Sequence, residues 1–198
     1  MRKFFGLLQP TSGEGTVAGF DILRQTGKIR TRIGYMSQKF SLYPDLTLRE
    51  NLALSAELYL VDKTVLRERL QEASHRAGIE PLLDRRTGEL PWGWQQRLSL
   101  ACATVHHPAV LFLDEPTGSV DPLSRRAFWD LIRAEAARGT TIFVTTHYMD
   151  EAEYCDRACF LVDGRVADLG APRELKDRHG VETLQEVFLA LARKARRS

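Results

Sequence analysis

The stretch Val110-Leu111-Phe112-Leu113-Asp114-Glu115 decides the fold of this chain. Its apolar part is continuous and is bounded by Pro108 and Pro116, which is typical of a β-strand buried on both faces. The two carboxylates stand where such a strand ends, and open α/β sheets bind their ligands at the carboxyl ends of their strands. A strand that simply runs into a solvated polar turn would show the same pattern.

Strands and helices alternate around this stretch. Thr141–Thr145 is β-branched and aromatic and predicts a second buried strand, and Ile33–Met36 predicts a shorter one. Asp121-Pro122 supplies a cap and a first-turn proline for a helix that Gly139 closes. Strand–helix–strand alternation predicts the α/β class, with a parallel sheet flanked by helices.

Helical spacing of apolar residues dominates the segment between the predicted strands Ile33–Met36 and Val110–Leu113. It predicts a helix over residues 48–60, a second helix capped by Asp62 and stopped by Gly78, and a third over 98–105. Towards the carboxyl end, the sequence predicts a β-hairpin with strands 158–162 and 165–169 and a final amphipathic helix around 184–191.

Composition excludes several classes of protein. A length of 198 residues favours one domain, and a net charge of +2 is too small to indicate a nucleic-acid-binding protein. Three cysteines without a C-x-x-C pair argue against a disulfide framework or a zinc site and favour a reducing compartment. No stretch is apolar enough to span a bilayer, so we expect any membrane role to come through a partner.

Four polar residues at predicted strand ends suggest chemistry on a nucleotide. Asp114 can hold Mg²⁺ through water, and Glu115 can orient an attacking water. His147 follows the strand Thr141–Thr145 and can donate a hydrogen bond to a phosphoryl oxygen, although a lone histidine there can equally be structural. Gln38 can reach a metal ion or water without adding charge.

Together with their neighbours, these residues resemble the nucleotide-binding domain of ATP-binding cassette (ABC) transporters over nearly the whole chain. The motifs follow in the family's order: a Q-loop at 34–38, the exporter-type continuation at 42–47 and 50–52, a signature segment at 90–97, Walker B at 110–115, a D-loop at 119–121, and the switch histidine His147. The resemblance implies one partial ATP-binding domain over 1–198, P-loop NTPase-like, with a helical subdomain at about 46–107. The absence of a sustained heptad there favours transport over DNA work.

The resemblance also implies the roles of the site residues. Glu115 would be the water-activating base, Asp114 and Gln38 would serve Mg²⁺, His147 would support the γ-phosphate of ATP, and Asp121 would couple two sites. The implied partners are a second ABC ATP-binding subunit and a transmembrane permease, with no nucleic acid. The implied location is the cytoplasm, on the inner face of the cell membrane, held by the permease.

One departure from the family concerns the phosphate-binding loop, because G-x-x-x-x-G-K-[ST] occurs nowhere in the chain. Residues 1–13 fit the helix that follows this loop, so we expect a truncated or mis-started frame that lacks the first strands. On this view the missing strand lies beside the Walker B strand, whose edge would be unpaired, and the chain alone would neither hydrolyse ATP nor fold robustly. A naturally shortened, non-hydrolysing subunit that pairs with a complete partner is the alternative.

The signature segment departs as well. Pro91 replaces a serine, Trp92 a glycine and Trp94 a glutamine, whereas Gly93 and Gln95 remain candidates for contact with the nucleotide. The helix that starts here would direct its N-terminus to phosphate. Trp92 and Trp94 could instead only pack the helical subdomain.

Overall fold

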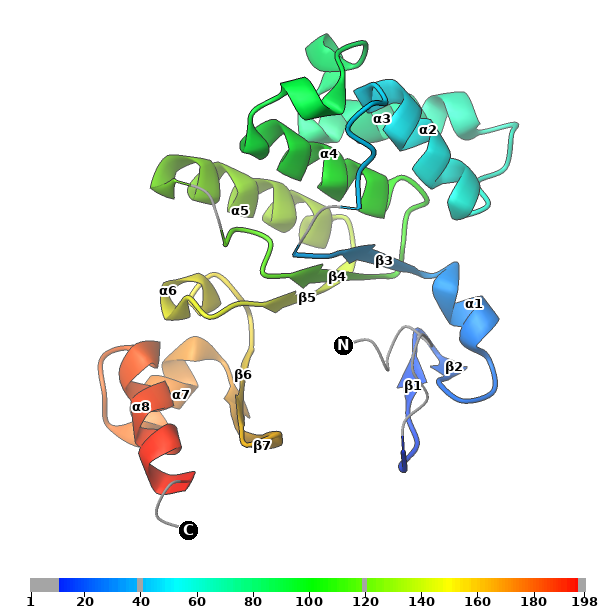
Figure 1. The fold of residues 1–198 in the computed structure, drawn as a ribbon. Coiled ribbons are helices and arrows are strands. Elements are labelled where there is room, and N and C mark those ends of the chain that lie inside the picture. Colours follow the sequence, from blue (N-terminus) through cyan, green and yellow to red (C-terminus); the bar gives the residue numbers. More distant parts are fainter. Residues whose placement is uncertain (1–10, 39–40, 119–120, 196–198) are drawn as a thin grey trace. The chain divides into compact units, whose positions relative to one another are not determined.

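The computed structural model describes residues 11–38, 41–118 and 121–195. The chain divides into two compact units, residues 1–145 and 146–198, and each unit is described by itself. The ribbon in Figure 1 follows the first unit from blue to yellow-green and the second from yellow to red.

A parallel three-stranded sheet lies at the centre of the first unit. Its strands are β3 (Ile33–Met36), β4 (Val110–Asp114) and β5 (Thr141–Thr145), in the order β3-β4-β5. The register pairs Met36 with Leu113 and Asp114 with Thr145, so the three strands end at the same edge. The α/β class with a parallel, helix-flanked sheet is therefore confirmed.

Two expectations about these strands were wrong. β4 does not present an unpaired edge, because it is hydrogen-bonded to β3 on one side and to β5 on the other. β5 is not buried on both faces: Phe143 is 54% exposed, although its ring stacks on that of Phe112 at a centroid distance of 5.2 Å. Within the described residues β5 has one strand neighbour and is therefore an edge of the sheet.

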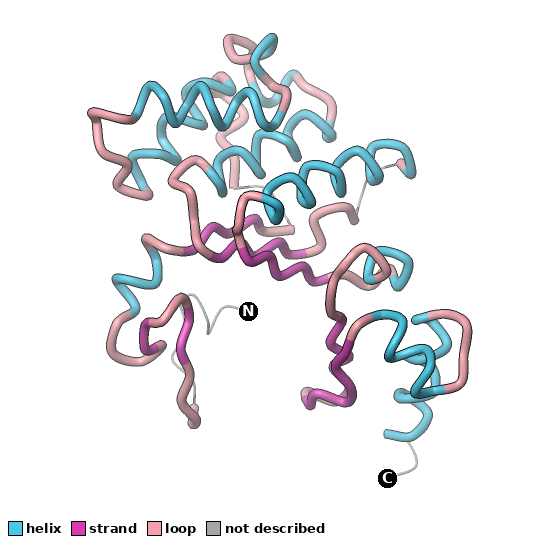
Figure 2. Tube along the Cα trace, turned by 180° about the vertical axis from the view of Figure 1, so that it is seen from behind, coloured by secondary structure: helices cyan, strands magenta, loops and turns pink. Residues whose placement is uncertain are grey.

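Helix α5 (Pro122–Ala137) runs along one face of this sheet, and the views in Figures 1 and 2 both place α2, α3 and α4 on that same side. α5 begins as expected, because the Asp121 side chain accepts from the backbone N–H groups of Leu123 and Ser124. Phe128, Trp129 and Ile132 form its buried stripe.

Three helices form the helical region within residues 46–107: α2 (Leu48–Leu58), α3 (Leu66–Ala77) and α4 (Trp92–Thr104), with 3₁₀ turns at Glu80–Leu82 and Thr87–Glu89. Thr47 and Glu50 form a capping box at the start of α2, and Gly78 ends α3 in the left-handed region at φ 65°. The predicted cap was misplaced, because Asp62 accepts from Thr64 in a turn that precedes α3.

The N-terminal part of the first unit is a small two-stranded ribbon and a short helix. Antiparallel β1 (Thr16–Val17) and β2 (Phe20–Asp21) precede α1 (Thr26–Arg30). Val17, Ile22 and Ile29 pack with the start of the central sheet, which joins this segment to the core.

The second unit contains the predicted hairpin and three helices. Its elements are α6 (Met149–Ala152), β6 (Ala158–Val162), β7 (Arg165–Gly170), α7 (Pro172–His179) and α8 (Leu184–Ala195). β6 and β7 are antiparallel, and the turn residues Asp163 and Gly164 both have positive φ, as a tight hairpin turn requires. Phe160 and Leu175 are among the residues that close its core against α8. Among the residues described, no helix is long and apolar enough to cross a membrane.

Candidate functional site

Asp114 is the last residue of β4, and two side chains from the flanking strands hold its carboxylate. Thr145 Oγ1 donates to Asp114 Oδ1 at 2.5 Å, and the Tyr35 hydroxyl donates to Oδ2 at 3.4 Å. The shared strand edge thus fixes one of the predicted carboxylates from both sides. Neither Tyr35 nor Thr145 was among the predicted site residues, although both lie at predicted strand ends.

Glu115 lies one residue beyond β4 in a left-handed conformation, at φ 46°. Such a conformation costs about 1–3 kcal/mol in a residue other than glycine, so the surroundings must impose it. The Glu115 N–H donates to the Thr145 carbonyl at 3.0 Å, and Glu115 Oε2 accepts from Gln38 Nε2 at 2.8 Å. The structure therefore brings the predicted base into contact with the predicted Q-loop glutamine.

The arrangement leaves suitable atoms for a magnesium ion. Gln38 engages Glu115 through its amide nitrogen, so its amide oxygen is the atom that can turn to a cation. Each carboxylate oxygen of Asp114 accepts one hydrogen bond and has a second lone pair. Mg²⁺ is bound by oxygen ligands such as carboxylates and amides, together with water. Asp114 and Gln38 therefore supply suitable types of ligand atom.

The signature segment forms the start of α4, with Pro91 as the residue before its first turn. A Cβ added to Gly93 would meet nothing within 4 Å, so packing inside the chain does not explain this glycine. Gln95 is turned inward: its Nε2 donates to the Leu90 carbonyl at 2.8 Å. That bond fixes the entry to the helix, and contact of Gln95 with a nucleotide stays a prediction.

The two tryptophans of this segment have different surroundings. Trp94 packs against the core of the helical region, and the Arg97 guanidinium lies 5.6 Å from its ring centroid. Trp92 is 41% exposed and lines a groove of about 590 Å³ together with residues at the start of α5, among them Leu123. Packing therefore accounts for Trp94, whereas Trp92 is presented at the surface of the groove.

Gln96, rather than Gln95, links α4 to the carboxylate site. Its side chain is buried and donates from Nε2 to the carbonyl of Pro116, the residue after Glu115. The sequence did not single out this role. The only signal was the pair of adjacent glutamines, and a change of one position on a helix turns a side chain by about 100°.

Asp121 also lines the groove beside Trp92. Hydrogen bonds from Ser124, through its side chain and its backbone, hold the pKa of Asp121 below the ordinary value, as the cap of α5 requires. Its predicted role in coupling two sites stays a prediction. Ser119 and Val120 of the expected D-loop lie outside the described residues.

His147 belongs to the second unit and is exposed. Its ring lies 4.1 Å from that of Tyr148, at an interplanar angle of 36°. The Tyr148 N–H donates to Thr146 Oγ1 at 3.0 Å, and Thr146 donates in turn to the buried Glu151 at 2.7 Å. The backbone on both sides of His147 is thereby held, and its catalytic role stays a prediction.

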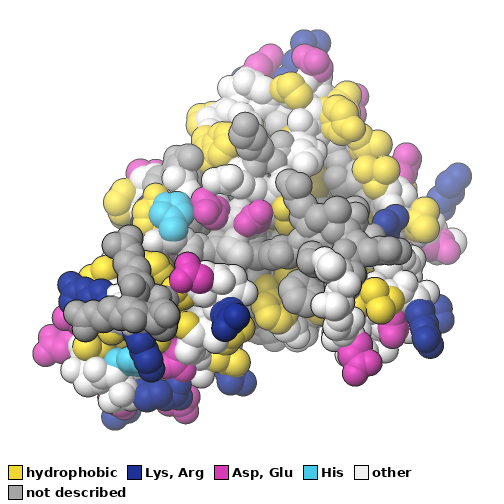
Figure 3. All heavy atoms as spheres, turned by 60° about the horizontal axis from the view of Figure 1, so that its bottom comes forward, with side chains coloured by type: hydrophobic (Ala, Val, Ile, Leu, Met, Phe, Trp, Pro, Cys, Tyr) yellow, Lys and Arg dark blue, Asp and Glu magenta, His cyan; other side chains and the backbone are white. Residues whose placement is uncertain are grey.

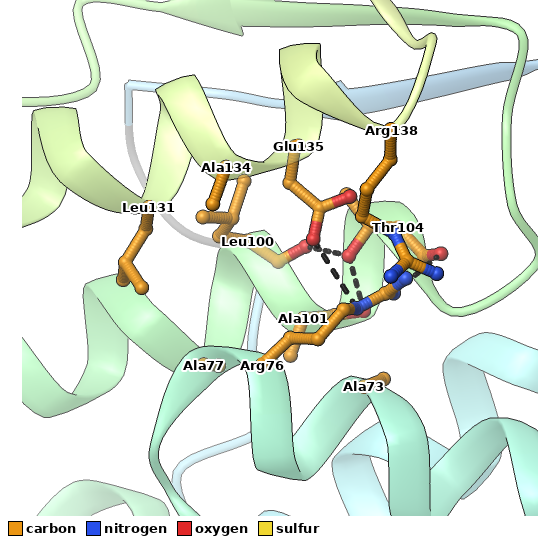
Figure 4. Close-up of a pocket in the computed structure, with 10 residues that line it drawn as sticks. All are labelled: Ala73, Arg76, Ala77, Leu100, Ala101, Thr104, Leu131, Ala134, Glu135 and Arg138. Atoms are coloured by element: carbon orange, nitrogen blue, oxygen red, sulfur yellow. Dashed lines mark hydrogen bonds and ion pairs between the residues drawn. The ribbon is translucent and has the colours of Figure 1, made fainter.

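A separate cavity of about 250 Å³ lies where α3 and α4 face α5 (Figure 4). Arg76 of α3 reaches across it, with Nε 3.2 Å from Glu135 Oε1 and Nη2 3.4 Å from the Thr104 carbonyl. Burial raises the pKa of Glu135 and lowers that of Arg76. None of the predicted site residues lines this cavity, so we regard it as structural.

Charges of both signs are mixed on the surface shown in Figure 3, where dark blue and magenta side chains alternate among hydrophobic ones.

Comparisons with known proteins give a consistent result. Residues 1–118 match the family described as "ABC transporter", and residues 95–149 also match one described as "AAA domain, putative AbiEii toxin, Type IV TA system". The chain is 44% identical over 191 residues to the probable multidrug ABC transporter ATP-binding protein YbhF of Escherichia coli K12, covering 94% of this chain and 33% of that protein. It is 38% identical over 176 residues to the Nod factor export ATP-binding protein I of Burkholderia orbicola, covering 88% of this chain and 58% of that protein. The chain thus spans less than two thirds of each of these relatives.

Solved structures agree. One described as the ATP-binding subunit of an ABC transporter superposes with a TM-score of 0.82 at 27% identity, covering 96% of this chain and 80% of that chain. The dimeric ATP-binding cassette MJ0796, bound to ADP and Pi, superposes with a TM-score of 0.74 at 27% identity, covering 86% and 78%. The fold is therefore that of ATP-binding cassettes.

Proposed function

From the premise that this chain belongs to the ABC transporter family, we propose that it is an ATP-binding and ATP-hydrolysing energy subunit of an exporter. The observation that carries the proposal is the contact of Gln38 with Glu115 next to Asp114, at the edge where three parallel strands end. The relatives named for multidrug and Nod factor export favour export over uptake.

In this mechanism Glu115 takes a proton from the water that attacks the γ-phosphate of ATP. The Gln38 amide keeps the Glu115 carboxylate oriented, and a general base held in this way contributes about 10²–10⁴-fold to the rate. His147 donates to the γ-phosphate and stabilises the charge that develops on it.

ATP and Mg²⁺ are the proposed cofactors. Mg²⁺ supplies positive charge against the phosphates when it is bound, and the oxygens of Asp114 and Gln38 are the groups of this chain that would hold it. Gly93 and the first turn of α4 would face phosphate, with Gln95 fixing that turn through Leu90 and Asp121 fixing the start of α5. The solved relative described as a dimer bound to ADP and Pi supports a nucleotide-binding dimer for this chain.

The proposed partners are a second ABC ATP-binding subunit, identical or different, and a transmembrane permease. Permease contact is assigned to residues 43–46, where Tyr43 is 55% exposed. Asn51 fixes this segment, because its Oδ1 accepts from the Tyr43 N–H at 2.8 Å and its Nδ2 donates to the Tyr43 carbonyl at 2.9 Å. Binding there would keep the chain on the inner face of the cell membrane.

The sequence contains no G-x-x-x-x-G-K-[ST], so hydrolysis requires a phosphate-binding loop from outside residues 1–198. The test joins a segment that carries a G-x-x-x-x-G-K-[ST] loop ahead of residue 1 and measures ATPase activity, with the unmodified chain as control. Activity in the joined protein that Glu115→Gln removes is the expected result. Failure of the folded, joined protein to bind ATP would refute the proposal.

A further inference from the structure

The second edge of β3 lacks a strand neighbour among the described residues. The first edge pairs with β4, and there the Arg32 carbonyl accepts from the Val110 N–H at 3.2 Å. Peptide groups of successive residues point to opposite edges of a strand, so the Ile33 carbonyl and the Tyr35 N–H face away from β4. Such groups need partners when they are withdrawn from water.

Two side chains from the helical region meet these groups. His106 lies just beyond α4, and its Nε2 is 3.0 Å from the Ile33 carbonyl oxygen. A carbonyl only accepts, so Nε2 must carry the ring proton. Tyr59, the residue that ends α2, faces the same edge: the backbone N–H of Tyr35 lowers the pKa of its hydroxyl, against the larger, raising effect of burial.

The two rings also hold each other. Tyr59 and His106 stack with centroids 3.7 Å apart and planes inclined by only 11°. Burial raises the pKa of Tyr59 and lowers that of His106 to about 4, so the pair is uncharged at neutral pH. It therefore covers the strand edge without bringing an unpaired charge to it.

The helix that ends near this pair lies directly against the strand. A Cβ on Gly34 would fall 2.1 Å from the Ala103 carbonyl oxygen of α4, so only glycine allows this approach. α4 begins at the signature segment, and β3 leads into Gln38. α4 is therefore in direct contact with β3, the strand that leads into Gln38.

We propose that Tyr59 and His106 act as one positioning unit, which takes the place of a neighbouring strand on β3 and sets the orientation of Gln38 towards Glu115. The inference depends on the proposed function only for the catalytic meaning of Gln38. Both are positioning residues, because they act through the backbone of β3.

The test is ¹⁵N NMR on the full chain, which reports on single amides. Tyr59→Phe removes one hydroxyl and keeps the ring, so hydrogen exchange at the Tyr35 amide becomes roughly tenfold faster while the Gly34 amide, bonded to β4, keeps its rate. The side-chain NH₂ signals of Gln38 shift in Tyr59→Phe and in His106→Phe. His106→Gln, which restores a donor for the Ile33 carbonyl, brings them back towards their original positions.

Tyr43→Phe is the matched control, because it makes the same change on an exposed tyrosine and should leave all these signals unchanged. Equal exchange of the Tyr35 amide before and after Tyr59→Phe, or unmoved Gln38 signals in both phenylalanine variants, would overturn the inference. If His106→Phe does not fold, Tyr59→Phe alone decides. A missing ATPase activity would remove the proposed function and leave these signals intact, so the two failures are distinguishable.

Discussion

The side-chain amide of Gln38 donates a 2.8 Å hydrogen bond to Glu115 Oε2, although 77 positions separate these residues in the sequence. The bond turns one oxygen of the carboxylate towards the amide. A second constraint acts on the backbone, since Glu115 is held at φ 46° by its bond to the Thr145 carbonyl. Both constraints would orient the proposed base before any substrate arrives.

Glu115→Gln should remove hydrolysis and keep nucleotide binding. The amide has nearly the size of the carboxylate and can still accept from Gln38, but it cannot take a proton, and loss of a general base typically costs about 10²–10⁴-fold in rate. Steady-state ATPase assays and nucleotide-binding titrations on the protein joined to a phosphate-binding loop measure both quantities. Unreduced turnover in this variant would mean that another group activates the water.

Leu46→Asp should uncouple the chain from its permease and leave the fold intact. Leu46 is half-buried in the segment held by Asn51, and a charge placed in an apolar interface costs about 2 kcal/mol or more. Co-purification with the permease and transport assays give the readout, and Leu189→Asp, an exposed leucine of α8, is the control. Full complex formation by Leu46→Asp would remove residues 43–46 from the interface.

The central strands were predictable because their apolar runs are bounded by prolines and polar residues, and β3, β4 and β5 lie where the pattern placed them. Exposure of Phe143 was not, since β-branched and aromatic composition does not distinguish an edge strand from a central one. The helix predicted over 98–105 was too short, because α4 already begins at Trp92, directly after Pro91. Tryptophan and glycine have weaker helix preferences than most residues, so the sequence did not place Trp92 and Gly93 in a helix.

Within the site, sequence order identified Asp114, Glu115 and Gln38, but not the bonds between them or the help of Thr145 and Tyr35. Side-chain pairing across a sheet depends on the register, which the sequence does not state. The choice between Gln95 and Gln96 likewise required the phase of α4.

Acid should destabilise the chain partly through His106. Its pKa is about 6.5 when unfolded and about 4 in the fold, because burial disfavours the charged ring. The unfolded state then binds more protons, so this contribution is complete above pH 6.5, falls as the pH drops to 4, and amounts to about 3 kcal/mol. Urea unfolding at several pH values measures it: the slope should flatten in His106→Gln and persist in His75→Gln, which alters an exposed ring. Equal slopes in all three proteins would contradict a buried, neutral His106.

The Arg76–Glu135 pair should behave as a buried ion pair, in which removal of either partner alone destabilises the fold. Arg76→Met leaves the buried Glu135 without the cation 3.2 Å away and should cost about 3–5 kcal/mol of unfolding free energy. Glu135→Leu should also destabilise, because Arg76 loses one of its carboxylate partners, but by less, since Glu72 remains 3.4 Å from Arg76. The double variant Arg76→Met/Glu135→Leu should lose less than the sum of the two, since apolar side chains can fill part of the cavity beside them. Denaturant unfolding of all four proteins completes this cycle. Strict additivity would show that the two side chains do not interact.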